Sequence, residues 1–347
     1  MLAYILKRLL WGVLLICAVT WITFVIFTIL PEERRGQATQ GLVTPNIQQQ
    51  FHLEGSLPEQ YVGFLQHVAL HADFGESLRQ PVEVRDEIFN ALPVTASLLL
   101  GGVLMWLILG FTIGFLSALR PRTILDKGLM LFVLIGVSAH PVWIGLMLSY
   151  FLGYRFEIFP IAGYCDFLYD PMSSNQCGGP RYWAYHLVLP WFSFALLFAA
   201  LYARMIRASM LEVMNEDYIR TAYGKGAGEV RVMRKHVLRN ALLPVVTMVG
   251  MDVGIAFSGA IFIESVFQLP GVGQVLFRAL PTLDLPMIMG VVFLVSVAVV
   301  VVNLLVDIIY CFIDPRISLK GGSSQEVSAP LRRRRRIQSQ VTEPSEA

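Results

Sequence analysis

Six long stretches that carry almost no charge limit what this chain can fold into more than any other feature of its sequence. The first, Leu9–Leu30, has 22 residues and no Asp, Glu, Lys or Arg. The others are Ala91–Leu119, Gly128–Tyr154, Tyr182–Ala203, Ala241–Ile263 with one acid at Asp252, and Leu285–Val306. A helix of about 20 apolar residues crosses the roughly 30 Å hydrocarbon core of a bilayer. The runs therefore predict six membrane-spanning helices.

The composition agrees with an all-α integral membrane protein. Only 15% of the 347 residues are charged, whereas a soluble domain carries about 25%. Backbone groups in lipid must pair internally, and the sequence lacks the alternating pattern of a membrane barrel. Because Lys7 and Arg8 precede the first run, a cleavable signal peptide is an alternative there. The run is longer than the usual 7–15 residues of a signal core, which favours an uncleaved anchor.

The distribution of Lys and Arg predicts the orientation in the membrane. The N-terminus, residues 119–127, residues 204–239 and the C-terminal tail hold 20 of the 27 basic residues. The segments on the other side hold 7. Loops rich in Lys and Arg stay in the cytoplasm. We therefore expect both termini and the loop 204–239 to be cytoplasmic, on one side of a cytoplasmic membrane.

The same topology divides the chain into four parts. Residues 1–30 would hold the cytoplasmic N-terminus and the first helix, and residues 31–90 an extracytoplasmic segment. Residues 91–319 would form the core with five helices and a cytoplasmic loop at 204–240. The tail 320–347 has the composition of a disordered segment. Its five consecutive arginines are expected to attract membrane lipid headgroups rather than nucleic acid.

Two of the four cysteines, Cys165 and Cys177, fall in an extracytoplasmic loop. An oxidising compartment permits a disulfide between them. Two free thiols are the alternative. Cys17 and Cys311 lie in or beside apolar runs and are expected to be packing residues.

A charged segment, Glu216–Arg239, separates the fourth and fifth apolar runs. Gly224, Gly226 and Gly228 lie between two stretches of helical composition, which predicts a helix, a bend and a second helix. Such a mixed-charge surface suits docking to a soluble partner. An ordinary positively charged cytoplasmic loop is the alternative, and it explains the basic residues but not the ordered composition.

The stretch Asp217–Val246 resembles the cytoplasmic signature loop of ATP-binding-cassette (ABC) importer permeases of the dipeptide/oligopeptide/nickel family. The similarity is to the first of that family's two paired membrane subunits, with a type I importer fold. Four further segments resemble the family in the same order: residues 73–100, 124–151, 264–280 and 302–319.

This resemblance implies a transport mechanism with several partners. A second homologous permease would complete the pathway, and an extracytoplasmic binding protein would deliver the substrate. Two cytoplasmic ATPases would bind ATP and Mg²⁺, so this chain would bind no cofactor. The residues expected to contact an ATPase are Asp217, Arg220, Thr221, Ala222, Gly226 and Arg231.

The chain lacks a phosphate-binding loop of its own. That motif needs G-x-x-x-x-G-K-[S/T]. Around Lys225, the first glycine is replaced by Ile219, and Gly226 follows the lysine. ATP hydrolysis is therefore expected in the partner subunits, and this chain is not expected to be an enzyme.

Asp252 is an acid near the middle of the fifth run. An acid at the centre of a membrane helix costs roughly 2.5–3.5 kcal/mol, so it should face the bundle or a wet cavity. It is predicted to line the translocation pathway with Met251, Ser258 and Gly259. Pairing with a polar group on a neighbouring helix is the alternative. Glu264 and Asp307, near the ends of their runs, are expected at the membrane interface.

His67, His71 and Asp73 have a spacing that could place three metal ligands together. They lie in an exposed segment without further ligands nearby in sequence. We expect surface side chains and no metal site.

Two other classes of membrane protein, a channel or carrier and an enzyme, would show different features in the sequence. A channel or secondary carrier would predict more ionisable residues in the spans or an inverted repeat. A membrane-embedded enzyme would need a catalytic constellation, which Asp252 and His140 alone do not supply. We predict the permease subunit of a di- or oligopeptide importer. The sequence leaves open whether the cargo is a dipeptide, a longer peptide or a nickel chelate.

Overall fold

The computed structural model describes residues 2–29, 57–71, 73–168 and 177–313. Within these ranges the regular structure is helical, with two isolated β-bridges at Glu76–Glu83 and Asp166–Gly178. The basic tail and most of the predicted outer segment 31–90 before α4 lie outside the described residues.

Among the described residues, four helices are long and apolar enough to cross a membrane. They are α1 (Leu2–Ile29), α5 (Val84–Leu119), α8 (Pro180–Met214) and α14 (Leu285–Ile313). The 36 residues of α5 correspond to about 54 Å at 1.5 Å per residue. Because this exceeds the thickness of the hydrocarbon core, α5 extends beyond it.

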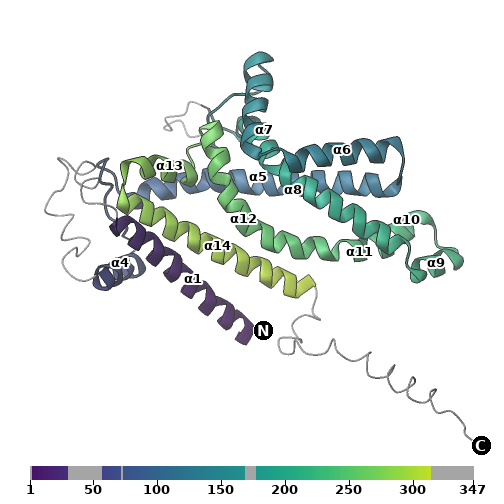
Figure 1. Ribbon diagram of the computed structural model, residues 1–347, viewed down its shortest axis with the longest axis horizontal. Coiled ribbons are helices and arrows are strands. Elements are labelled where there is room, and N and C mark those ends of the chain that lie inside the picture. The colour runs from purple at the N-terminus through teal and green to yellow at the C-terminus, as the bar shows by residue number, and fades with distance from the viewer. Residues whose placement is uncertain (1, 30–56, 72, 169–176, 314–347) are drawn as a thin grey trace, which may run out of the picture.

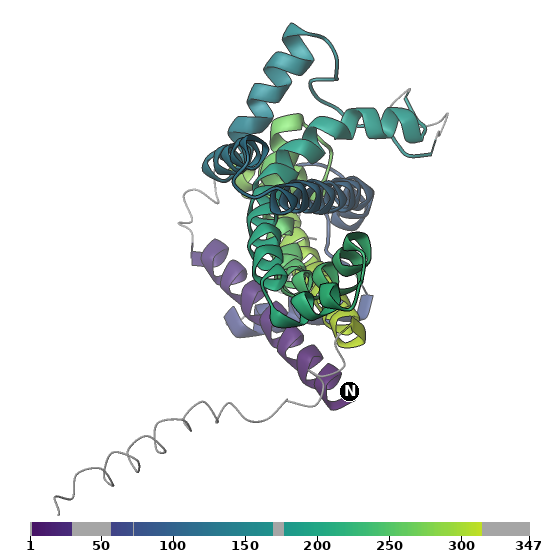
Figure 2. The same cartoon turned by 90° about the vertical axis from the view of Figure 1, so that its right-hand side faces the viewer.

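The third apolar run is a bent pair of helices. α6 (Ile124–Ser138) is followed by α7 (Pro141–Leu148) and the π-helix η1 (Ser149–Arg155), and the direction changes by 107°. Pro141 begins α7, where its missing N–H costs no helical hydrogen bond. α7 contacts α8 and α12, and the two views show the bent pair at the edge of the bundle (Figures 1 and 2). Pro141 therefore marks the break in the third span.

The fifth run lies in α12 (Leu243–Phe267) and is also bent. The helical stretch Glu229–Gly250 meets Asp252–Phe267 at 53°. Six spans are therefore present if each bent pair counts as one, but two of them are not the uninterrupted helices that the run lengths predicted.

Small residues bring α5 and α8 together. A Cβ atom on Gly114 of α5 would lie 2.6 Å from the carbonyl oxygen of Ala203 on α8, so only glycine allows this approach. About two turns before Gly114 on α5, Trp106 stacks on Phe198, which lies about one turn before Ala203 on α8. The ring centroids are 4.4 Å apart. The helices α5 and α8 together form the centre of the bundle.

α1 packs along α14 and is covered at one end by α4 (Leu57–His71) (Figure 1). The hydroxyl of Tyr61 on α4 lies 2.7 Å from Thr20 Oγ1 and donates to the carbonyl of Cys17 at 2.8 Å. α4 and α13 (Val272–Thr282) lie at one end of the bundle. The start of α1 and the end of α14 point toward the other end, where α9 and α10 lie. We call that second end the coupling end.

Candidate functional site

The charged segment at the coupling end forms a helix, a bend and a second helical stretch, as predicted. α9 (Asp217–Gly224) follows α8 after two residues. The side-chain amide of Asn215 donates to the carbonyl of Leu211 at 2.7 Å, at the end of α8. Asp217 lies in the first turn of α9, where the helix dipole favours a negative side chain.

Gly226 makes the bend after α9. Its φ is +77°, a value that is strained for a residue with a Cβ atom. The N–H of Gly226 donates to the carbonyl of Tyr223 at 2.9 Å, and that of Ala227 donates to Ala222 at 3.2 Å. These bonds close the end of α9 and direct the chain into α10 (Glu229–Val232).

Apolar side chains hold this segment against α8. α10 continues into η2 (Met233–Val237) and α11 (Leu238–Ala241), and both contact α8. Ile219, Val232 and Val237 are 2%, 0% and 1% exposed and belong to the same hydrophobic core as residues of α8. The charged side of the segment therefore faces away from the bundle.

Most residues predicted to contact an ATPase lie on this outer side. Asp217, Arg220, Thr221, Gly226 and Arg231 are exposed, and Ala222 is half-buried against the core. Arg220 Nη1 and Asp217 Oδ1 are 3.7 Å apart, and both side chains are largely exposed. An exposed pair of this kind contributes little to stability.

Two exposed apolar side chains flank the bend. Tyr223 is 46% exposed and Val230 is 71% exposed. Val230 was not among the residues predicted to contact an ATPase. Its signal is the alternation with Val232, which is buried two residues later and so lies on the opposite side of the chain.

Asp252, one of the predicted pathway residues, is bonded to a neighbouring helix. The hydroxyl of Tyr202 on α8 donates to Asp252 Oδ2 at 2.8 Å, and Tyr202 is fully buried. The structure therefore contains the pairing that the sequence left as an alternative. Asp252 itself is half-buried, and its role in a pathway stays a prediction.

The other predicted pathway residues separate on α12. Ser258 is exposed and shares one stripe of the helix with Ile255 and Phe262, which are also exposed. We call these three residues the α12 stripe. Gly259 instead faces α8, since a Cβ atom there would lie 3.6 Å from the ring of Phe194. The side chain of Met251 lies outside the described residues.

Glu264, which the sequence predicts near the membrane interface, is fully buried within the protein near the end of α12. Its Oε1 accepts from the hydroxyl of Thr95 on α5 at 2.6 Å, and its Oε2 accepts from the N–H of Gly273 at 2.8 Å. Thr95 Oγ1 also accepts from the N–H of Val272 at 2.9 Å. The carboxylate thus supplies the first turn of α13 with acceptors and ties it to α5. Asp307, the other acid expected at the interface, has a side chain outside the described residues.

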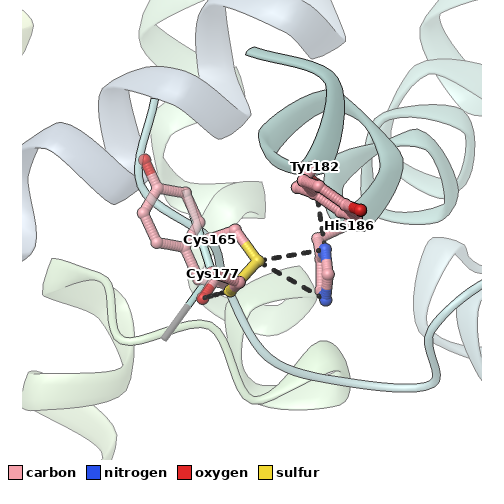
Figure 3. Close-up of a disulfide and its surroundings, with 5 residues drawn as sticks. Cys165, Cys177, Tyr182 and His186 are labelled. Atoms are coloured by element: carbon pink, nitrogen blue, oxygen red, sulfur yellow. Dashed lines mark hydrogen bonds between the residues drawn. A yellow bond between two sulfur atoms is a disulfide. The ribbon is translucent and has the colours of Figure 1, made fainter. Parts of the chain in front are cut away.

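Cys165 and Cys177 are joined by a disulfide in the loop between η1 and α8 (Figure 3). His186 of α8 lies beside it, with Nδ1 3.4 Å from Cys165 Sγ. The same loop is bonded to α12, because the N–H of Gly163 donates to the carbonyl of Phe267 at 3.1 Å. The disulfide therefore joins the two ends of a loop that is bonded to the end of α12 and leads into α8.

His67, His71 and Asp73 were considered as metal ligands and predicted to be surface side chains instead. The side chains of His67 and His71 lie outside the described residues. Within the described part of the chain, His, Cys, Asp and Glu form no group of three or more that could hold a metal ion.

Family models match nearly the whole described chain. Residues 110–319 match the binding-protein-dependent transport system inner membrane component, and residues 1–99 match the N-terminal part of the same kind of membrane component. A putative peptide permease protein of Brucella suis biovar 1 (strain 1330) is 36% identical, with 92% of this chain and all of that protein covered.

Other relatives are similar over almost their full length. A probable D,D-dipeptide transport system permease protein of Escherichia coli (strain K12) is 34% identical, with 92% of this chain and 98% of that protein covered. A dipeptide transport system permease protein of Bacillus subtilis (strain 168) is 32% identical, with 91% and 98% covered.

A solved structure shares the fold. An inward-facing form of the MetNI methionine ABC transporter contains a chain that matches with a TM-score of 0.50 and 17% identity. The match covers 66% of this chain and 96% of that one. It supports the predicted importer permease fold.

Proposed function

The chain belongs to the family of binding-protein-dependent transport system inner membrane components, and on this premise we propose that it is the permease subunit through which di- or oligopeptides are imported. Membership makes it a multi-pass membrane subunit of an ABC importer that works with ATPase and binding-protein partners. The peptide cargo is supported by the relatives from three bacteria, whose names specify peptides or dipeptides.

The observation that carries the mechanism is the charged helix–bend–helix held on α8. Its apolar side is buried and its polar side exposed, as docking to a soluble protein requires. The contact surface for one ATPase consists of Asp217, Arg220, Thr221, Ala222, Gly226 and Arg231. The second homologous permease receives the other ATPase, and the two ATPases bind ATP and Mg²⁺. When the two ATPases close on ATP, they move α9–α11. This movement switches the pathway from an inward-facing to an outward-facing state by a rigid-body change.

The peptide pathway runs between this chain and the second permease. On this side it follows the α12 stripe, with Met251, Asp252 and Ser258 as the residues nearest the cargo, whereas Gly259 packs against α8. A binding protein delivers the peptide from outside. The excess of Lys and Arg at both termini and at α9–α11 supports a cytoplasmic position for these segments.

Reconstitution of the complex tests this function. The chain, the second permease, both ATPases and the binding protein are placed in liposomes, and peptide uptake and ATP hydrolysis are measured. Arg220→Glu reverses a charge in the contact surface and should abolish peptide-stimulated ATP hydrolysis and uptake while the membrane subunits still pair. Lys235→Glu reverses an exposed charge outside that surface and is the matched control. Uptake that continues without the ATPases would refute the proposal and favour a channel or carrier.

A further inference from the structure

An ion pair with a buried carboxylate and a partly exposed guanidinium joins three helices at the coupling end. Arg207 of α8 donates to Asp126 of α6 through Nε at 2.9 Å and through Nη2 at 2.8 Å. Ser117 of α5 also donates to this carboxylate. The N–H of Arg122, in the turn between α5 and α6, donates to Asp126 Oδ2 at 2.8 Å. Asp126 is 3% exposed and Ser117 is fully buried.

The pair lies next to the attachment of the charged segment. Ile206 and Met210, which flank Arg207 on α8, are buried in the same core as Ile219 and Val232. α8 therefore contacts α9–α11 through its apolar side chains and bonds to α5 and α6 through Arg207. A continuous path of packed and bonded side chains leads from the segment to three membrane helices.

The chemistry of the pair suits the transfer of a movement. Two parallel hydrogen bonds between a guanidinium and a carboxylate fix both distance and orientation. A lysine in place of Arg207 would keep the charge but not this planar geometry. The bond to Ser117 extends the constraint to α5, so that α5, α6 and α8 cannot shift separately at this end.

We infer that Arg207 and Asp126 are positioning residues that make α5 and α6 follow α8 when the ATPases move the charged segment. The inference rests on the proposed function, since it needs a coupled ATPase. It assigns to the pair a part in the transmission of force, whereas a purely structural pair would affect only folding and assembly.

The test needs a variant that removes the link without leaving a buried unpaired charge. Loss of one partner of a buried ion pair is strongly destabilising, whereas replacement of both can be nearly neutral. The double variant Asp126→Asn/Arg207→Met meets this requirement. Asparagine keeps an acceptor for the N–H of Arg122, and its side-chain amide can donate to the Ser117 hydroxyl, which rotates to accept. Methionine keeps the packing of the arginine stem. Arg204→Gln, an exposed position one turn earlier on α8, is the matched control.

The readout is the number of ATP molecules hydrolysed per peptide imported by the complete reconstituted complex. Mutations along a coupling path change coupling by amounts equivalent to roughly 2- to 30-fold. We expect a rise in this range for the double variant and no rise for Arg204→Gln. Arg207→Lys, which keeps the charge, should give a smaller rise.

The remaining outcomes separate this inference from the proposed function. An assembled double variant with the wild-type ratio would overturn the inference. If the double variant does not assemble, Arg207→Lys decides in its place, and a wild-type ratio or a failure to assemble there would show a structural role only. If the wild-type complex itself shows no ATP-dependent uptake, the proposed function fails instead.

Discussion

Glu264 and Thr95 show what single side chains do where α5, α12 and α13 meet. Thr95 donates to the Glu264 carboxylate and accepts from the N–H of Val272, so one hydroxyl serves two buried groups. A Cβ atom on Gly271 would collide with the same carboxylate. The start of α13 is therefore fixed by polar bonds in a place where apolar packing alone would leave its N–H groups unpaired.

Thr95→Val tests this arrangement. The substitution keeps the shape but leaves a carboxylate oxygen and an N–H without their partner, which costs about 1–3 kcal/mol. We expect a lower thermal unfolding temperature in detergent. Thr112→Val on the same helix removes an exposed hydroxyl that bonds only to the carbonyl of Ile108, and it should change stability by less than about 0.5 kcal/mol. Equal changes in the unfolding temperature of the two variants would show that the bonds of Thr95 to Glu264 and Val272 stabilise the fold no more than an exposed hydroxyl does.

Asp252 and Tyr202 allow the charge and the hydrogen bond to be tested separately. Tyr202→Phe removes the donor, and such bonds inside membranes contribute about 0.6 kcal/mol on average. Asp252→Asn keeps an acceptor for Tyr202 but removes the charge. We expect Tyr202→Phe to lower stability slightly with normal uptake, and Asp252→Asn to lower uptake of reconstituted complexes. Normal uptake by Asp252→Asn would leave the acid a structural role only.

At the scale of elements, the bend after α9 depends on one backbone conformation. Gly226 has φ +77° and Gly228 has φ −66°, and a Cβ atom at either position would meet no atom within 4 Å. The two glycines therefore differ in conformation and not in available space. That difference makes them a matched pair for experiment.

Gly226→Ala should be harmful and Gly228→Ala should not. An alanine with positive φ costs roughly 1–2 kcal/mol, which the segment can avoid only by changing the bend. We expect Gly226→Ala to lower peptide-stimulated ATP hydrolysis, measured at equal amounts of assembled complex. If both alanine variants behave like the wild type, the bend is not needed for docking.

The approach of α5 and α8 gives a second pair of glycines. A Cβ atom on Gly114 would lie 2.6 Å from a backbone oxygen of α8, whereas one on Gly128 of α6 would meet nothing within 4 Å. Forcing an extra methyl group into a packed core costs about 1–3 kcal/mol. Gly114→Ala should therefore reduce thermal stability. Gly128→Ala should leave it unchanged or raise it by up to about 1 kcal/mol through better helix propensity.

For the whole molecule, the sequence predicts what depends on neighbouring residues. The length of an apolar run and the glycines of the bend are local features, and four of the six runs and the bend have their expected counterparts among the described residues. The two bent spans do not, because run length carries no signal for a bend. The burial of Glu264 and its bond to Thr95 were not predicted, because Thr95 lies 169 residues earlier and carries no local signal. The ion pair between Asp126 and Arg207, 81 residues apart, was missed for the same reason.

The orientation of the whole molecule is the last prediction, and it follows from charge. The segments at the coupling end, with the N-terminus and the tail, hold most of the basic residues, so this end should face the cytoplasm. Lys225→Cys at the bend and Arg278→Cys on α13 place exposed thiols at opposite ends. Cys17→Ala and Cys311→Ala remove the other thiols and leave the disulfide intact.

A membrane-impermeant maleimide then reports the side on which each thiol lies. In intact cells Arg278→Cys should react and Lys225→Cys should not, and both should react after the membrane is permeabilised. Both must also react in denatured protein, which controls for reactivity. The reverse pattern in intact cells would place α9–α11 outside, where cytoplasmic ATPases cannot reach them. The proposed docking surface would then be wrong together with the orientation, because the side of the membrane decides which partners α9–α11 can meet.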